Sequence, residues 1–158
     1  MGAHSFEVRE AADGDRHQVA KLFAAVAEER DGIATEPPLD VEELAEAWRL
    51  DGTLVAAAGD EVIGWLHVER SVFGFGEIGM LVAREWRSRG VGSALVAAAI
   101  DWGRRHELHK LTLSVFPHNE AAIALYRKFG FEHEGYRKKQ MRRASGELWD
   151  LIEMGLLL

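Results

Sequence analysis

The chain has 158 residues, of which 47% are hydrophobic and 28% charged, and this size and composition predict a single globular domain over residues 1–158. The formal net charge of −7 argues against general nucleic-acid binding, and the absence of cysteine excludes disulfides, zinc–thiolate sites and a cysteine nucleophile. No apolar run is long enough to span a membrane, and Met1–Phe6 lacks the charged-then-apolar pattern of a signal peptide. A cytoplasmic protein is therefore expected.

The first half of the chain predicts strands and two amphipathic helices. Asp15 and Gln18 form a capping-box pattern before a helix that Asp31-Gly32 ends. Asp40 begins a second helix, which Asp51-Gly52 ends, with Leu44, Ala47 and Trp48 on its buried side. Three segments have the pattern of strands, the last two joined by a Gly59-Asp60 turn: Phe6–Arg9, Leu54–Ala58 and Glu61–Glu69.

The second half is organised around the stretch Glu77–Gly92. After a loop at Arg70–Gly76, this stretch predicts a strand, a loop with two arginines and two glycines, and the start of a helix. The remaining predicted elements are a strand over Lys110–Phe116, a helix from Asn119 to Gly130, and strands over His133–Met141 and Leu148–Leu156.

A strand that leads through a glycine loop into a helix is a suitable anion site. Glycine lets the backbone approach a phosphate closely, and free N–H groups at the helix start point at it. A Walker A loop is excluded because no Lys precedes Ser93, and a Rossmann fingerprint because Leu95 stands where its third glycine belongs. A tight turn with solvated arginines is the alternative at this point.

Two motifs resemble the GNAT superfamily of acyl-CoA-dependent N-acyltransferases. The pattern Arg87-x-x-Gly90-x-Gly92 resembles its pyrophosphate loop. The segment Asn119-x-x-Ala122-x-x-Leu125-Tyr126-x-x-x-Gly130-Phe131 resembles its second signature, and one helix and one strand separate the two, as in the family. The resemblance covers nearly the whole chain and implies an α/β fold, with a mostly antiparallel mixed sheet of about seven strands and about four helices.

The resemblance implies acetyl-CoA as acyl donor, with no metal, and assigns residues to it by motif. Tyr126 is placed near the sulfur, where its phenol would donate a proton to the leaving thiolate. The strands near Leu81 and Thr112 must separate to admit acetyl-CoA. The implied binding residues are Leu81, Val82 and Ala83 for the pantetheine arm and thioester, Arg87, Ser88, Arg89, Gly90, Val91, Gly92 and Ser93 for the pyrophosphate through backbone amides, and Asn119 and Ala122 beside the pantetheine.

Glu77 stands at the strand position where some family members place a general base. A carboxylate at a strand start is as often merely solvated, and Tyr126 also has the spacing of a core residue, so both alternatives stay open. Gly79 is interpreted as a bulge that opens the strand pair.

The implied reaction is direct transfer of an acetyl group to a primary amine in a ternary complex. The acceptor is a small amine, an amino acid or a protein amine, with Glu77 and Asp150 mildly favouring a cationic one.

Other interpretations also follow from the sequence. A non-catalytic acyl-CoA-binding regulatory module is the main alternative. The basic cluster Arg137–Arg143 is expected to be a solvated hairpin side, with binding of an acidic substrate or of nucleic acid as the lesser alternative. The acidic net charge disfavours the nucleic-acid role. His106-Glu107-Leu108-His109 does not have metalloprotease spacing. Phe73, Phe75 and Trp149 are candidate acceptor-pocket residues, with ordinary core or rim packing as the default interpretation. A homodimer through the C-terminal strands is an option from the family.

Overall fold

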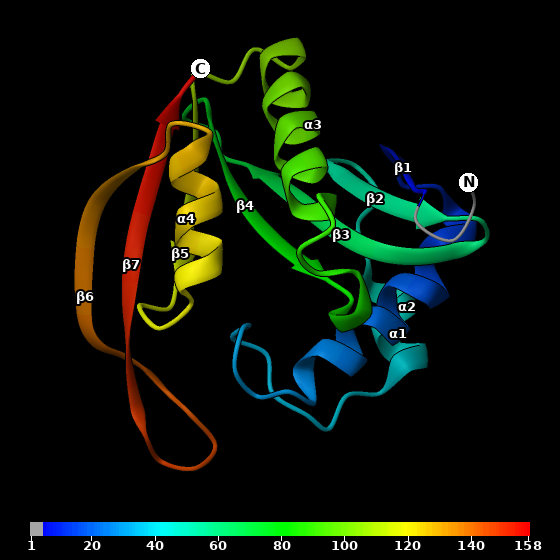
Figure 1. Ribbon diagram of the computed structural model, residues 1–158, viewed down its shortest axis with the longest axis horizontal. Helices are drawn as coiled ribbons and strands as arrows, with labels where there is room; N and C mark the ends of the chain where they lie inside the picture. The colour runs from blue at the N-terminus through cyan, green and yellow to red at the C-terminus, as the bar shows by residue number, and fades with distance from the viewer. Residues whose placement is uncertain (1–4) are drawn as a thin grey trace.

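The computed structural model describes residues 5–158, and its elements follow the predicted order along the chain (Figure 1). Residues 1–4, on which most of the Met1–Phe6 prediction falls, lie outside the described residues. The strands are β1 (Glu7–Glu10), β2 (Thr53–Ala58), β3 (Glu61–Arg70), β4 (Phe75–Val82), β5 (Lys110–Val115), β6 (Glu132–Arg142) and β7 (Leu148–Leu157). The helices are α1 (Arg16–Ala27), α2 (Val41–Ala47), α3 (Val91–Arg105) and α4 (Glu120–Lys128), with short 3₁₀ turns η1 (Asp13–Asp15) and η2 (Arg84–Trp86).

The strands form one mixed sheet in the order β1-β2-β3-β4-β5-β7-β6. Neighbouring strands are antiparallel except for β4 and β5, which run parallel and are connected through α3. A parallel pair needs such a crossover connection, because the chain must return to the same end of the sheet. The predicted α/β fold with seven strands and four helices is confirmed.

Different helices cover the two faces of the sheet. A Cβ added to Gly64 of β3 would lie 2.9 Å from Val91 and 3.0 Å from Leu95, so α3 packs directly against this face, called here the α3 face. The next residue, Trp65, points to the opposite face and packs against Phe23 of α1 with ring centroids 5.5 Å apart. We call this the α1 face. Figure 1 shows α4 beside α3 on the same side of the sheet.

The main hydrophobic core lies between the sheet and these helices. Trp102 of α3, Leu66 of β3 and Leu111 of β5 are almost completely buried in it. Each such side chain contributes about 1.5–3 kcal/mol relative to an exposed position. The core therefore fixes β3, β4, β5 and α3 relative to one another, and these elements carry the candidate site.

All three predicted helix starts are confirmed, but the side-chain cap predicted at Asp15 is absent. The side chains of Asp40 and Asn119 accept hydrogen bonds from the third residue beyond them, at 3.0 and 3.3 Å. Asp15 makes no such cap; its carboxylate instead accepts from Ala12 N–H at 2.7 Å and from the Arg9 guanidinium at 2.7 and 3.0 Å. The competing partner Arg9 comes from β1, outside the local window of a capping motif.

Several predicted boundaries also differ from the structure. Helix α1 ends at Ala27, before the predicted Asp31-Gly32 stop, and α2 ends at Ala47, which is exposed rather than buried. The predicted Arg70–Gly76 loop is shorter, because β3 extends to Arg70 and β4 begins at Phe75. The β3–β4 register shows no shift, so the predicted bulge at Gly79 is wrong.

Candidate active site

The parallel pair β4–β5 opens into a gap. The ladder has only three residue pairs, beginning at Phe75 with Lys110 and ending at Glu77 with Thr112. Beyond this point β4 continues to Val82 while β5 pairs with β7 through Val115 and no longer with β4. The two strands therefore separate toward the end of β4, as the resemblance required near Leu81 and Thr112.

One hydrogen bond fixes which main-chain groups of β4 face this gap. Ala83 N–H donates to the carbonyl oxygen of Ile63 at 2.8 Å, and the β3–β4 register is continuous along the ladder. In an antiparallel pair, successive residues direct their N–H and C=O groups alternately toward and away from the partner strand. Leu81 therefore faces β3, as Ala83 does, while Met80 and Val82 present their main-chain groups to the gap.

This alternation corrects the main-chain residues expected from the motif. Of Leu81, Val82 and Ala83, only Val82 can offer a main-chain N–H to a ligand in the gap. Met80, which the sequence reasoning missed, offers a second. The register between β3 and β4 decides which main-chain groups face the gap, and a sequence motif on β4 alone cannot predict that register.

The loop after β4 presents unpaired backbone donors at the start of α3. Gly90 is the N-cap of α3 with φ +86°, a left-handed conformation that glycine adopts without strain, and no side chain caps this end. Within residues 5–158, no acceptor is bonded to the N–H groups of Ser88, Gly90, Val91, Gly92 and Ser93. These donors and the positive end of the helix dipole suit a diphosphate at the open end of the gap.

The two glycines of the loop have different physical roles. Around Gly90 an added Cβ would meet nothing within 4 Å, so only the backbone conformation requires glycine there. At Gly92 the Cβ would lie 2.9 Å from Leu125 of α4 and 3.6 Å from Met80. Gly92 therefore lets α3 and α4 approach closely beside the gap.

The two arginines of the loop have protein partners. The Arg87 guanidinium forms two hydrogen bonds with the Glu29 carboxylate, at 2.7 and 2.8 Å, and Arg87 Nε donates to Val82 O at 3.1 Å. The Arg87 N–H also donates, to Arg84 O at 3.3 Å, so the structure does not leave it unpaired as the motif suggested. The guanidinium of Arg89 lies 5.3 Å from the centroid of the Trp86 ring.

The pairing between Arg87 and Glu29 has an electrostatic consequence. Hydrogen bonds from Arg87 hold the pKa of the Glu29 carboxyl below its ordinary value, and the positive charge of Arg87 acts in the same direction. Glu29 therefore stays ionised at neutral pH. The pair connects the glycine loop to the end of α1.

Helix α4 brings the second signature to the α3 face. Asn119 uses its side-chain oxygen to cap the helix at Ala122, which leaves its amide nitrogen available. The Tyr126 ring is buried against Phe131, with centroids 5.6 Å apart. Among the described residues the Tyr126 hydroxyl has no hydrogen-bond partner. Its oxygen is nevertheless not fully buried, so the hydroxyl reaches a solvent-accessible space.

Burial raises the pKa of Tyr126 to about 12. The phenol is therefore fully protonated at neutral pH and can donate a hydrogen bond. Complete transfer of its proton to a thiolate with a reference pKa of about 8.5 would be uphill by about 5 kcal/mol. The raised pKa therefore favours a role for Tyr126 as a hydrogen-bond donor to the thiolate rather than as a group that transfers its proton completely.

Glu77 lies on the α1 face, at the end of the gap where β4 and β5 are still paired. It is the third residue of β4 rather than a strand start, and its exposed side chain shares the α1 face with Gly79. Its cross-strand partner on β3 is Glu69, whose carboxylate is bonded by His67 and Arg49 at 3.0 Å each. The Glu77 carboxylate has no hydrogen-bond or ion-pair partner within residues 5–158, although its main chain is paired in the sheet.

Other sequence candidates lie away from the gap or have structural roles. Phe73 is 78% exposed in the β3–β4 turn, at the opposite end of β4 from the glycine loop. His106 stacks on Trp102 with centroids 3.8 Å apart. In the described part of the chain, no three His, Asp or Glu side chains are grouped to hold a metal, and no helix is both long and apolar enough to cross a membrane.

Comparison with known proteins agrees with this geometry. The profile of the acetyltransferase (GNAT) family matches residues 17–131, more than half of the chain. The chain belongs to this family. The matched range runs from α1 to just beyond α4, so it contains the gap, the glycine loop and Tyr126.

Curated relatives of this GNAT protein include enzymes that acetylate amino groups. The L-amino acid N-acetyltransferase AaaT of Escherichia coli (strain K12) is 36% identical over 111 residues, which span 64% of this chain and 65% of the relative, just under two thirds of its length. The L-methionine sulfoximine/L-methionine sulfone acetyltransferase of Pseudomonas aeruginosa (strain PAO1) is 28% identical over 166 residues, spanning 98% of this chain and 95% of the relative.

Solved structures share the fold over almost the whole chain. The ribosomal-protein-alanine N-acetyltransferase from Brucella melitensis has a TM-score of 0.84 and 28% identity, covering 96% of this chain and 99% of that chain. The acetyltransferase yncA from Salmonella typhimurium, solved with its cofactor acetyl-CoA, has a TM-score of 0.84 and 24% identity, covering 97% and 94%.

Proposed function

We propose that this GNAT protein transfers an acetyl group from acetyl-CoA to a primary amine by direct attack in a ternary complex. The observation that carries the proposal is the β4–β5 ladder that stops at Glu77 and Thr112, with unpaired amides of the α3 N-terminus at its open end. Both features fit a long ligand with a diphosphate at one end. Homology to acetyltransferases of amino groups supports the same reaction class.

The chain's own groups supply the electrostatics of the reaction. The N–H groups of Ser88 and Gly90 to Ser93 bind the diphosphate, with Asn119 beside the pantetheine arm. The N–H groups of Met80 and Val82 line the gap, where a preorganised donor stabilises the negative charge that develops on a thioester oxygen. Tyr126 donates its hydrogen bond to the sulfur from the α3 face. No cysteine is present to carry a covalent intermediate, which agrees with direct transfer.

In the proposal the acceptor approaches from the α1 face, because α3 and α4 both lie on the opposite one. Glu77 is the unpartnered carboxylate on that face at the closed end of the gap, so it attracts an ammonium group and accepts its proton, directly or through water. Gly79, two residues further along β4, leaves room beside it.

The test measures free-thiol release from acetyl-CoA in the presence of a panel of L-amino acids, L-methionine sulfone, spermidine and an alanine-initiated peptide. The proposal expects release that depends on one of these amines. Tight acetyl-CoA binding without release for any amine would instead favour a non-catalytic acyl-CoA-binding module. A cytoplasmic location and a homodimer through the C-terminal strands remain part of the proposal, to be examined by fractionation and light scattering.

A further inference from the structure

Two carboxylates stand directly opposite each other on the α1 face of β3 and β4. Glu69 of β3 is the cross-strand partner of Glu77 of β4, and the next pair on the same face is His67 with Gly79. Directly opposite residues have Cβ atoms about 4.5–5.5 Å apart, and like charges at such positions destabilise a sheet. The charge of Glu69 therefore acts on Glu77 at short range.

The two carboxylates differ in their partners. Arg49 donates to Oε1 of Glu69 at 3.0 Å, and Nε2 of His67 donates to Oε2 at 3.0 Å. The hydrogen bond from His67 is the main cause that holds the pKa of the Glu69 carboxyl below its ordinary value, and the charges of Arg49 and His67 act in the same direction. Glu69 is therefore ionised at neutral pH and its charge is compensated, whereas the described part of the chain offers the Glu77 carboxylate no cation.

Thr53 of β2 fixes the hydrogen-bonding role of the His67 ring. The Thr53 hydroxyl donates its single hydrogen to Arg49 O at 2.6 Å, so it can only accept from Nδ1 of His67, 2.9 Å away. Nε2 of His67 faces the ionised carboxylate of Glu69, which also only accepts. The full set of bonds therefore requires a hydrogen on both ring nitrogens, which is the positively charged form of the side chain.

Aromatic packing holds His67 in this orientation. Its ring stacks on Trp65 with centroids 6.2 Å apart and planes 12° apart. The Trp65 ring in turn packs against Phe23 of α1 and against Trp48, which follows α2, with centroids 5.5 and 5.1 Å away. The positive charge of His67 is thus fixed one residue pair away from Glu77.

Other charged groups around these two carboxylates are bound to each other. The negative charge of Asp51 acts on Glu69, but Arg70 binds its carboxylate at 2.9 Å. Thr112 of β5 lies beside Glu77, and the charged side chains nearest to it along β5 and β7 form the pairs Lys110–Glu134 at 2.9 Å and Arg137–Glu153 at 3.2 Å. Changes in charge at Glu69 and its two cations are therefore the changes to which Glu77 is most exposed.

We infer that Glu69, with Arg49 and His67 bound to it, sets the pH range in which Glu77 works as a base. The inference rests on the proposed function, in which a proton passes from the acceptor's ammonium nitrogen to a Glu77 oxygen and then to water. Compensation of Glu69 favours the ionised form of Glu77, which attracts the ammonium group. Loss of a cation from Glu69 favours the protonated form instead. The three residues act through Glu77 and touch neither reactant, so they are positioning residues.

The pH profile of kcat, measured with the best acceptor of the amine panel, tests the inference. Glu77→Gln should remove the limb at lower pH and so assigns that limb to Glu77. Arg49→Gln and His67→Gln each remove a positive charge and should raise the midpoint of this limb by about 0.3–1 pH unit. Glu69→Gln removes the nearest negative charge and should lower the midpoint. The Arg49 side chain is 75% exposed, so its replacement should not affect folding.

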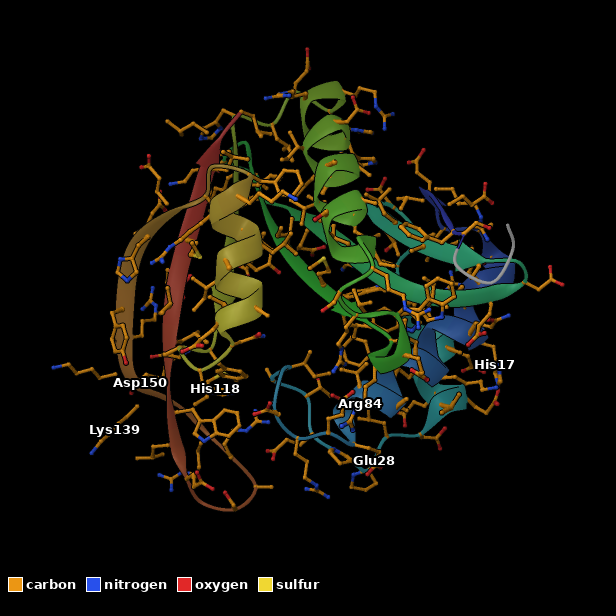
Figure 2. All side chains as sticks on the ribbon, viewed as in Figure 1. His17, Glu28, Arg84, His118, Lys139 and Asp150 are labelled. Carbon is orange, nitrogen blue, oxygen red and sulfur yellow. The ribbon has the colours of Figure 1, made fainter. Side chains whose placement is uncertain are left out.

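A second histidine–glutamate pair provides the matched control. Nε2 of His17 lies 3.0 Å from the Glu42 carboxylate, and Figure 2 shows His17 beside α1, away from the β4–β5 ladder. His17→Gln should leave the midpoint unchanged. The shifts at Arg49, His67 and Glu69 should also shrink at high ionic strength, because exposed charges are screened by salt.

The outcomes separate the inference from the proposed function. Thiol release with an unchanged midpoint in Arg49→Gln and His67→Gln would overturn the inference alone. Shifts in the same direction in all three variants would also overturn it, because a structural disturbance does not follow the sign of the charge removed. A limb that persists in Glu77→Gln would do the same, since Glu77 would not be the base. A wild-type protein that releases no thiol with any amine would overturn the proposed function and the inference with it.

Discussion

The N–H of Ala83 donates to the carbonyl oxygen of Ile63 at 2.8 Å, and this bond sets the direction of every main-chain group on the second half of β4. It leads to a residue-level prediction for hydrogen exchange. The amides of Leu81 and Ala83 should exchange slowly in the free protein, because β3 protects them. Those of Met80 and Val82 should exchange quickly and become protected when acetyl-CoA is added.

Exchange followed by NMR checks this prediction, with the four neighbouring amides as internal controls. Protection of Met80 and Val82 before any ligand is added would mean that the gap is closed in solution. Equal changes in protection at all four amides on addition of acetyl-CoA would mean that the alternating direction of the main-chain groups does not decide which of them bind the ligand.

Gly90→Ala should separate stability from acetyl-CoA binding. The substitution places a side chain at φ +86° and costs about 1–2 kcal/mol of stability, with no steric contact to add to it. A relaxed loop would also misdirect the amides, so the Kd for acetyl-CoA should rise at least tenfold. Gly59→Ala, in the β2–β3 turn at φ +61° and equally open surroundings, is the matched control. Calorimetric titration of both variants would refute the role of the loop if they bound acetyl-CoA alike.

Tyr126→Phe should slow turnover without weakening acetyl-CoA binding. Loss of one hydrogen bond to a developing thiolate lowers kcat roughly 10- to 100-fold, while the buried ring keeps its packing. The chain has one other tyrosine, Tyr136, which is exposed and bonded to Asp150, and Tyr136→Phe should keep the wild-type kcat. Because the pKa of Tyr126 is raised to about 12, its hydroxyl should cause no loss of rate up to pH 10. Steady-state kinetics with equal kcat in both variants would remove Tyr126 from the chemistry.

The ion pair between Asp15 and Arg9 predicts a pH-dependent stability. The hydrogen bond from Arg9 lowers the pKa of Asp15 below its ordinary value of 3.8, so the stabilisation is complete above that pH and is lost as the pH falls through the lower folded value. Asp15→Asn should therefore cost about 1–2 kcal/mol at pH 7, and the difference from wild type should shrink below pH 3.8. Urea unfolding at several pH values measures it; a difference that stayed constant down to pH 2 would contradict the assignment.

Local signals in the sequence predicted the parts of the site that depend on neighbouring residues. Asp40, Asn119 and Gly130 were predicted at helix ends because capping involves residues within one turn, and all three were confirmed. The glycine loop before α3 followed from the same kind of short-range pattern. The order of elements along the chain was also predictable from hydrophobic periodicity.

The parts that could not be predicted depend on partners distant in the sequence. Which amides of β4 face the gap depends on pairing with Ile63, and the partner of Arg87 is Glu29, separated from it by 58 residues. Asp15 failed as a cap because Arg9 of another element binds it. Pairing between residues distant in the sequence leaves no periodic pattern in the chain. The motif that ends at Gly92 therefore cannot predict these partners.

The central claim is that the unpaired amides at the start of α3 bind the diphosphate of acetyl-CoA. Thermal unfolding in the presence of each of two ligands tests this claim most directly. A ligand at about one hundred times its Kd stabilises the native state by about 2.7 kcal/mol. For a domain of this size that is a Tm rise of roughly 5–10 °C. The account predicts such a rise with acetyl-CoA and almost none with S-acetylpantetheine, which lacks the diphosphate, at the same concentration. No rise with acetyl-CoA, or an equal rise with both, would contradict it.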